Sequence, residues 1–464
     1  MSKPLVACIT LGDARRDFYA QRAHIVEEES GKLKAYLATQ SQLYMPDPVF
    51  SAEEARTIAD EIRTRHIRCV IVYVPIWGTP NLATQLAYST DLPVFIVGNL
   101  RPDTSSLVAL LATAGMLEQG GKQVIRIIGD CSDEKFQKQL STNIKALQVV
   151  ENVQASQFCL IGGQSIGIGT TIADFAQWRK LWQLDTEHAD QYEVVKRAEA
   201  IDDKRVLLHQ GWLETKLGAI EFGKLFTKES LNRQIRSYLA LKDMVSDGGF
   251  DFIALKCQRE LSDHYAVQCL AIALLNNPFD AEGNKPVIPC ACEGDCDGAL
   301  TMYLLHQCDK EQPSCLVDIR SYDVSKKEFT FANCGGMAFA YAALNSVDEA
   351  MTSAKMMPHV FGEAGGGTTQ FMAQPGIITA ARLFRKDGNY CMGAFKGEVM
   401  HRSRESLVAN YIYPHAFIKA DIDFDSFVQS MGSNHMHYVY GDYVDELEKL
   451  CEIQGIRMYN YTKE

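Results

Sequence analysis

The chain lacks several features that mark other classes of protein. None of its apolar runs is long enough to cross a bilayer, and it has no basic excess, since 46 Lys and Arg against 58 Asp and Glu give a net charge of −12. Nucleic acid and anionic membrane surfaces are therefore poor partners. Internal repeats and low-complexity linkers are missing as well. A hydrophobic content of 47% is too high for a disordered chain.

Secretion and disulfide signals are also missing. Residues 1–12 hold only a short apolar run without a cleavage pattern, which favours a cytoplasmic protein. Fourteen cysteines in such a chain are better interpreted as reduced thiols. Cys290, Cys292 and Cys296 lie close together, but their spacing matches neither a zinc knuckle nor a ferredoxin. A redox protein built on these thiols is a minor alternative, and buried thiols lining a pocket are the main interpretation.

What is present predicts an α/β protein of three domains. Short β-branched strands alternate with helical stretches over residues 1–155, which is typical of a parallel, Rossmann-like or flavodoxin-like sheet with helices on both faces. The expected strands are Leu5–Leu11, Cys69–Val74, Val94–Gly98 and Val124–Gly129, and the expected helices are Ser51–His66, Leu82–Ser89 and Ser105–Gln119.

A second α/β domain is expected over residues 156–320. It begins with a strand near Phe158 and a glycine-rich loop, residues 162–169, whose spacing fits neither a dinucleotide fingerprint nor a phosphate-binding loop. Helical regions follow at Glu187–Arg205 and Glu229–Gly248, then strands at Phe252–Leu255 and Val287–Cys292.

Beyond residue 320 the pattern changes. Short strands separated by turns predict a mainly antiparallel β domain over residues 321–464, closed by a helix at Asp442–Gly455. The expected strands are Phe329–Ala332, Gly376–Phe384, Tyr390–Gly397, His415–Lys419 and Met436–Tyr440.

Three side chains at the ends or interiors of apolar strands suggest a metal site. Glu293 follows one strand and Asp318 interrupts another, while His435, beside an asparagine far downstream, shares a strand face with His437, so that either imidazole could be the ligand. Two carboxylates and an imidazole are a partial ligand set for a hard divalent cation that leaves positions open for substrate oxygens. Arg320 lies on the same strand face as Asp318, so a structural ion pair is an equal alternative for that acid.

Other polar residues follow strands and are candidates for binding. Lys256 ends an apolar strand and could stabilise an oxyanion, or could lie on the surface with its ammonium in water. Arg15, Arg16 and Trp77 follow the first and second strands of the first domain, where parallel sheets bind ligands. Turn residues with a solvated arginine pair are the alternative there.

Taken together, an ordered set of short motifs resembles the L-fucose isomerase family. The resemblance covers most of the chain, most closely from Asp251 to Gly441. The motifs are ACEGDCDGALTM at residues 291–302, VDIR at 317–320, NCGG at 333–336, GGGTTQF at 365–371, PGIITAARL at 375–383 and SNH at 433–435.

The resemblance implies two α/β domains and a β domain in a homotrimer or homohexamer, with manganese as cofactor. It implies metal ligands at Glu293, Asp318 and His435, while His437 has no match in the family pattern. The same two acids would move a proton between neighbouring carbons of an aldose and its ketose. Lys256, Gln258 and Asn333 would orient the sugar hydroxyls.

The substrate is an open question at this stage. Some relatives act on sulfoquinovose, and Arg15 and Arg16 have the donors to grip its anionic group. Neutral sugars such as L-fucose or L-arabinose are the other candidates. A non-catalytic sugar-binding or sensing protein on the same fold is the alternative function, although it would not need the complete metal set.

Overall fold

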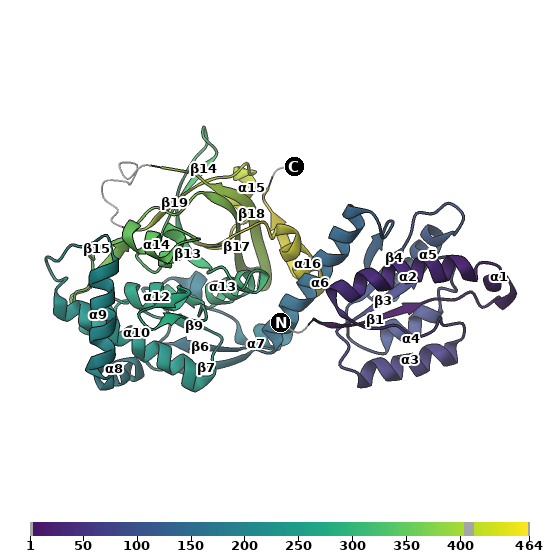
Figure 1. The fold of residues 1–464 in the computed structure, drawn as a ribbon, viewed down its shortest axis with the longest axis horizontal. Helices are drawn as coiled ribbons and strands as arrows, with labels where there is room; N and C mark the ends of the chain where they lie inside the picture. Colours follow the sequence, from purple (N-terminus) through teal and green to yellow (C-terminus); the bar gives the residue numbers. More distant parts are fainter. Residues whose placement is uncertain (1–2, 403–412, 463–464) are drawn as a thin grey trace. The chain divides into compact units, whose positions relative to one another are not determined.

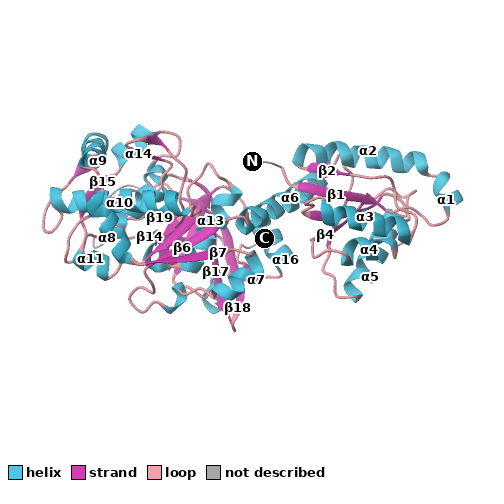
Figure 2. Ribbon diagram, turned by 90° about the horizontal axis from the view of Figure 1, so that it is seen from below, coloured by secondary structure: helices cyan, strands magenta, loops and turns pink. Residues whose placement is uncertain are grey.

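The computed structural model describes residues 3–402 and 413–462, which form two compact units, Met1–Glu151 and Asn152–Glu464. Figure 1 shows the path of the chain, and Figure 2 shows its strands and helices by type. Each unit has a sheet of its own. The predicted fold class, parallel α/β sheets followed by a mainly antiparallel sheet, is confirmed.

The first unit is a parallel sheet covered by helices. Its strand order is β2-β1-β3-β4-β5, the flavodoxin-like order, and every pairing is parallel. The strands are β1 Leu5–Thr10, β2 Gln42–Tyr44, β3 Cys69–Val74, β4 Val94–Gly98 and β5 Ile125–Ile128. The helices are α1 Arg16–Ala20, α2 Ala23–Gln40, α3 Ala52–Thr64, α4 Leu82–Tyr88, α5 Ser106–Gln119 and α6 Glu134–Gln154, which ends just past the boundary.

Burial explains why these strands could be predicted. β3 and β4 are buried along their whole length, as the β-branched sequence of a central parallel strand requires. The predicted strands and helices of this unit are confirmed within a few residues. Two long helices, α2 and α6, were missed, because their charged residues blur the apolar period.

The second unit begins with another parallel sheet, in the order β12-β9-β6-β7. Its strands are β6 Gln157–Ile161, β7 Asp185–Ala189, β9 Phe252–Leu255 and β12 Cys290–Ala291. The prediction of continuous helix from Glu187 was wrong, because β7 runs to Ala189 and pairs with β6 along its length. The helices are α7 Phe175–Trp182, α8 Gln191–Ala200, α9 Asp203–Lys216, α10 Lys228–Gly248, α11 Glu260–His264, α12 Cys269–Asn276 and α13 Cys296–Cys308.

The antiparallel strands close into a barrel. Pairing runs β17-β20-β13-β14-β19-β18, and β18 pairs back with β17, so the ring has no free edge among the described residues. Figure 1 shows these strands curving round a common axis. They are β13 Cys315–Asp323, β14 Glu328–Ala332, β17 Gly376–Lys386, β18 Asn389–Val399, β19 His415–Lys419 and β20 His435–Tyr440, with β21 Arg457–Asn460 parallel to β18.

Smaller elements complete this unit. The short helices are α14 Val347–Ser353, α15 Phe424–Ser430 and α16 Val444–Gln454, with 3-10 turns η1 Gly169–Thr171, η2 Cys292–Gly294 and η3 Phe339–Ala342. The short strands are β8 Ala219–Ile220, β15 Lys355–Pro358 and β16 Gly367–Gln370, and the hairpin β10 Phe279–Asp280 with β11 Gly283–Asn284. The three-domain division at residue 320 stays a prediction, since residues 152–464 form one compact unit.

Helix α13 connects the two sheets of the second unit. It packs on β9 and β12 of the parallel sheet and on β17 and β20 of the barrel. Its residues are buried on every side, as expected of a helix without a polar face. The N-terminus of α13 therefore lies where the parallel sheet and the barrel meet. Among the described residues, no helix is long and apolar enough to pass through a bilayer.

Candidate active site

Strand pairing in the barrel brings Asp318 and His435 together. β13 and β20 are antiparallel neighbours, and their register places Asp318 directly opposite His435. Side chains of directly opposed residues emerge on the same face of a sheet. His435 Nε2 lies 3.7 Å from Asp318 Oδ1, and the other Asp318 oxygen lies 3.4 Å from Arg320. The ion pair with Arg320, one of the two alternatives for Asp318, is thus present together with the approach to His435.

Glu293 reaches the same imidazole from the parallel sheet. It lies in η2, the turn between β12 and α13, and its Oε2 is 3.1 Å from His435 Nε2. Its backbone is left-handed, with φ +60°, which is uncommon for a residue with a side chain and is often found at functional sites. The next residue, Gly294, is also left-handed, and a Cβ there would lie 2.4 Å from the carbonyl oxygen of Gly163. The turn therefore packs directly on the glycine-rich loop.

Asp295 holds the far side of the imidazole. Its Oδ2 accepts a hydrogen bond from His435 Nδ1 at 2.7 Å and another from Arg382 at 2.6 Å. Its Oδ1 accepts from the amide of Gly298, which caps α13. The side chains of Asp295 and Arg382 have no exposed surface. His435 is therefore held between carboxylates on both of its ring nitrogens.

The charges of the cluster follow from these contacts. Burial alone would lower the pKa of His435, but its hydrogen bonds to Asp295 and Glu293 outweigh it and raise the pKa to about 10. Burial would raise the pKa of Asp295, yet the charge of Arg382 and the bond from His435 hold it well below its usual range. Burial raises the pKa of Asp318 to about 6; the charge of His435 opposes this rise and that of Glu293 adds to it.

The donor set suits a divalent cation in its chemistry. Two carboxylates and one imidazole are ligands that manganese and similar ions accept. Adjacent ligand atoms around an octahedral ion with bonds of about 2.1 Å lie about 3 Å apart, close to the 3.1 Å between Glu293 and His435. Asp318 is farther away, and no three His, Cys, Asp or Glu side chains of the described residues form a complete cage.

Comparison with known proteins connects this site to a family. The model of the L-fucose isomerase first N-terminal domain matches residues 21–158, and that of the L-fucose isomerase C-terminal domain matches residues 331–462. The chain belongs to the L-fucose isomerase-like family. His435 lies inside the second matched region, while Glu293 and Asp318 lie between the two.

Relatives in this family extend the likeness over the whole chain. A sulfoquinovose isomerase of Clostridium sp. (strain MSTE9) is 23% identical over 98% of this chain and 98% of its own. A sulfoquinovose isomerase of Alkalicoccus urumqiensis is 20% identical over 67% of each chain, and that of Priestia aryabhattai is 18% identical over the full length of both. Because these identities are low, the names describe the activity of the relatives and are not transferred to this chain.

Two of the predicted sugar-binding residues lie near the Glu293 turn. The Cβ of Lys256 is 3.7 Å from the Cβ position of Gly294, although its ammonium pairs with Glu260 at 2.7 Å. Gln258 accepts a hydrogen bond from Ser165 of the glycine-rich loop through its backbone carbonyl. Their roles toward a sugar stay predictions.

The amide of Asn333 is engaged within the protein. Its Nδ2 donates to the carbonyl of Leu316 at 2.7 Å, and its Oδ1 accepts from the backbone of Gly335 and Gly336. Asn333 therefore joins the exit of β14 to β13 at Leu316, two residues before Asp318. This contact gives Asn333 a structural part near the site, whatever its part in binding sugar.

Arg15, Arg16 and Trp77 belong to the first unit. The Arg15 guanidinium makes two hydrogen bonds to Asp13, and Arg16 pairs with Glu54 at 2.9 Å. Trp77 packs against the apolar core of that unit. All three follow the carboxyl ends of β1 and β3, where a flavodoxin-like sheet binds ligands. Their part in substrate binding stays a prediction.

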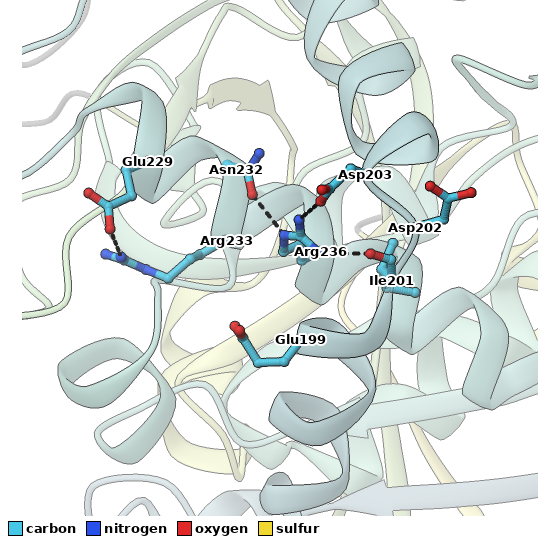
Figure 3. Close-up of a pocket in the computed structure, with 8 residues that line it drawn as sticks. All are labelled: Glu199, Ile201, Asp202, Asp203, Glu229, Asn232, Arg233 and Arg236. Carbon is cyan, nitrogen blue, oxygen red and sulfur yellow. Dashed lines mark hydrogen bonds and ion pairs between the residues drawn. The ribbon is translucent and has the colours of Figure 1, made fainter.

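A separate hollow of about 660 Å³ lies on the second unit, between α8, α9 and α10. Figure 3 shows its lining, in which Arg233 contacts Glu229, and Arg236 contacts Asn232 and Asp203. The further contacts of both arginines go to backbone carbonyls. None of Glu293, Asp318 and His435 lines it, and both of its arginines are already paired with carboxylates.

Two residues of the site, Asp295 and Arg382, had no role in the sequence prediction. Both lie inside motifs that carry the family resemblance. Arg382 stands in an apolar strand sequence, where a buried charge needs a partner. That partner lies 87 positions away, so its identity could not be read from local pattern.

Proposed function

We propose that this protein is a divalent-cation-dependent aldose–ketose isomerase. The observation that supports it most strongly is the convergence of Glu293 and Asp318 on one ring nitrogen of His435. These residues come from the parallel sheet and from two barrel strands. The family to which the chain belongs and the names of its relatives support the same class of reaction.

The reaction requires a proton to leave the carbon beside a carbonyl and to return to the neighbouring carbon. Glu293, Asp318 and His435 would hold the cation, for which manganese is the first candidate; the bound ion would polarise the carbonyl. Glu293 and Asp318 would move the proton. A carboxylate within hydrogen-bond reach of the sugar can accept the proton from one carbon and return it to the neighbouring carbon.

Sulfoquinovose leads the substrate candidates, with L-fucose and L-arabinose as neutral alternatives. The relatives named above support the sulfonated sugar. Arg15 and Arg16 supply guanidinium groups at the carboxyl-end rim of the first unit, and such groups bind sulfonates through paired donors. Lys256 and Gln258 are the proposed contacts for sugar hydroxyls.

The test is turnover of a panel of neutral and sulfonated aldoses by chelator-stripped protein, with and without added manganese. Ketose formation that depends on the added ion is expected, with sulfoquinovose preferred. Equal turnover with and without the ion after stripping would contradict the cofactor. Binding of the sugars with no turnover under any condition would instead favour a sensor.

A further inference from the structure

We propose that Asp295 and Arg382 are positioning residues for His435, which fix its ring so that Nε2, and not Nδ1, faces Glu293 and Asp318. The meaning of this orientation for catalysis rests on the proposed function. The orientation itself rests on three buried side chains from three different elements: the start of α13, β17 and β20.

The Asp295 carboxylate cannot turn freely. Its Oδ1 accepts from the Gly298 amide at 2.9 Å, and its Oδ2 accepts from both Arg382 and His435. An ionised carboxylate, such as this one paired with Arg382, only accepts hydrogen bonds. The ring nitrogen that faces it must therefore carry a proton, so Nδ1 keeps its proton whether or not Nε2 also carries one.

The guanidinium of Arg382 is held at two points. One arm donates to Asp295, and the other donates to the backbone carbonyl of Thr170 at 2.8 Å. The hydroxyl of Thr170 donates in turn to Asn434, the residue next to His435. The chain of contacts thus returns to the strand that carries the imidazole.

This arrangement has a direct consequence for the opposite ring nitrogen. Because Nδ1 keeps its proton, Nε2 is the nitrogen that would release its proton when a cation binds, and its lone pair would then face the space shared with the two carboxylates. An amide at position 295 would present an NH₂ group to either Gly298 or His435, where only an acceptor fits. The imidazole ring would then no longer be held in one orientation.

The experiment measures the Mn²⁺ affinity of full-length, chelator-stripped protein by calorimetry for wild type and Asp295→Asn. We expect affinity to fall about 10- to 100-fold in the variant, as for other partners of metal-binding histidines. Arg382→Lys keeps the charge but has one ammonium in place of the two donor arms of the guanidinium. Its Mn²⁺ affinity should therefore lie between that of wild type and that of Asp295→Asn. An unchanged affinity in Asp295→Asn would overturn the inference.

Asp280→Asn is the matched control. Asp280 is another buried carboxylate of the same unit, paired with Lys242 at 2.6 Å and bonded to the Tyr238 hydroxyl, and it has no contact with the site residues. It should lose stability and keep its Mn²⁺ affinity. If Asp280→Asn weakens Mn²⁺ binding as much as Asp295→Asn does, general destabilisation is the cause and positioning is refuted.

A second readout separates this inference from the proposed function. In protein labelled with ¹⁵N-histidine and free of cations, the Nδ1 proton of His435 should give a downfield resonance protected from solvent, lost in Asp295→Asn. Its absence from wild type overturns the positioning. If the resonance behaves as expected but the wild type neither binds Mn²⁺ nor isomerises any sugar, the orientation stands and the proposed function fails.

Discussion

At the scale of single residues, two buried acids at the start of α13 have pKa values shifted in opposite directions. Asp295 pairs with Arg382 and His435, and its pKa is lowered in spite of burial. Asp297 is bonded by neutral donors, Trp178 Nε1 at 3.1 Å and the Tyr390 hydroxyl at 2.8 Å. Burial raises its pKa to about 7, against the more distant charge of Arg382. A positive charge in contact with the carboxylate decides the direction of the shift.

The raised pKa of Asp297 predicts that the stability of the protein depends on pH. Because its folded pKa is raised above the ordinary 3.8 to about 7, the folded protein holds the proton more tightly than the unfolded chain. This stabilisation is complete below about pH 4 and is lost as the pH rises through 7. Between pH 5 and 8, the free energy of unfolding of wild type should fall by about 3 kcal/mol relative to Asp297→Asn.

Denaturant unfolding of both proteins at the two pH values provides the measurement. Asparagine keeps an acceptor for Trp178 and Tyr390, so the variant should fold. A constant difference between the two proteins from pH 5 to pH 8 would show that Asp297 is ionised throughout.

The second prediction at this scale concerns the proposed role of Glu293 as a base. Glu293→Gln keeps the size of the side chain and removes the base, so turnover should fall roughly a hundred- to ten-thousand-fold. Steady-state assays with the preferred sugar measure the loss, and circular dichroism checks that the fold is kept. Turnover near the wild-type rate would rule Glu293 out as the proton carrier.

At the scale of elements, the turn η2 determines where Glu293 points. Two successive left-handed residues, Glu293 and Gly294, join the end of β12 to the capped start of α13. The turn lies against the backbone of Gly163 in the glycine-rich loop. This loop, whose glycine spacing fits no nucleotide-binding fingerprint, thus has a packing function beside the site.

We expect Gly294→Ala to disturb this turn. A left-handed backbone is strained for alanine, and the new Cβ would lie 2.4 Å from the Gly163 carbonyl. The strain is of the order of 1–3 kcal/mol, and activity should fall more than stability because Glu293 moves. Activity assays and thermal unfolding measure the two effects.

Gly163→Ala is the control for this substitution. A Cβ at Gly163 meets nothing within 4 Å, and its φ is outside the left-handed region. It should therefore fold like wild type and keep a similar activity. Equal losses in both variants would mean that the loop, and not the turn, is sensitive.

At the scale of the whole molecule, the chain forms two units with separate cores. The first is built on its own five-stranded sheet, with an apolar core that includes Ile9, Val72 and Ile96. The proposed cation ligands all belong to the second unit, in η2, β13 and β20. A ligand stabilises the cooperative unit that contains its site.

Added Mn²⁺ should therefore protect one unit selectively. At about one hundred times its dissociation constant, a ligand stabilises the folded state by about 2.7 kcal/mol. Hydrogen exchange followed by mass spectrometry should show slowed exchange in β13, β20 and α13, and no change in β1, β3 and β4. Equal slowing in both units would show that they unfold together.

Much of this architecture was predictable from local pattern. Buried parallel strands such as β3 and β4 are continuous apolar runs, and the barrel strands are largely apolar stretches bounded by turns and loops. Elements whose sequence mixes polar and apolar residues without a clear period were harder to predict. β7 reads Asp-Thr-Glu-His-Ala and looks helical, yet pairing with β6 makes it a strand, because tertiary hydrogen bonds outweigh a weak local preference.

By itself, the sequence determined the fold class and singled out Glu293 and Asp318, because acids in apolar strands need a partner, while the family resemblance chose His435 over His437. Only the tertiary structure decided that these three meet, and that Asp295 and Arg382 lie behind them. The register of β13 against β20 and the packing of α13 between two sheets set those contacts. Contacts between residues 87 to 140 positions apart depend on how whole elements pack, which no local pattern encodes.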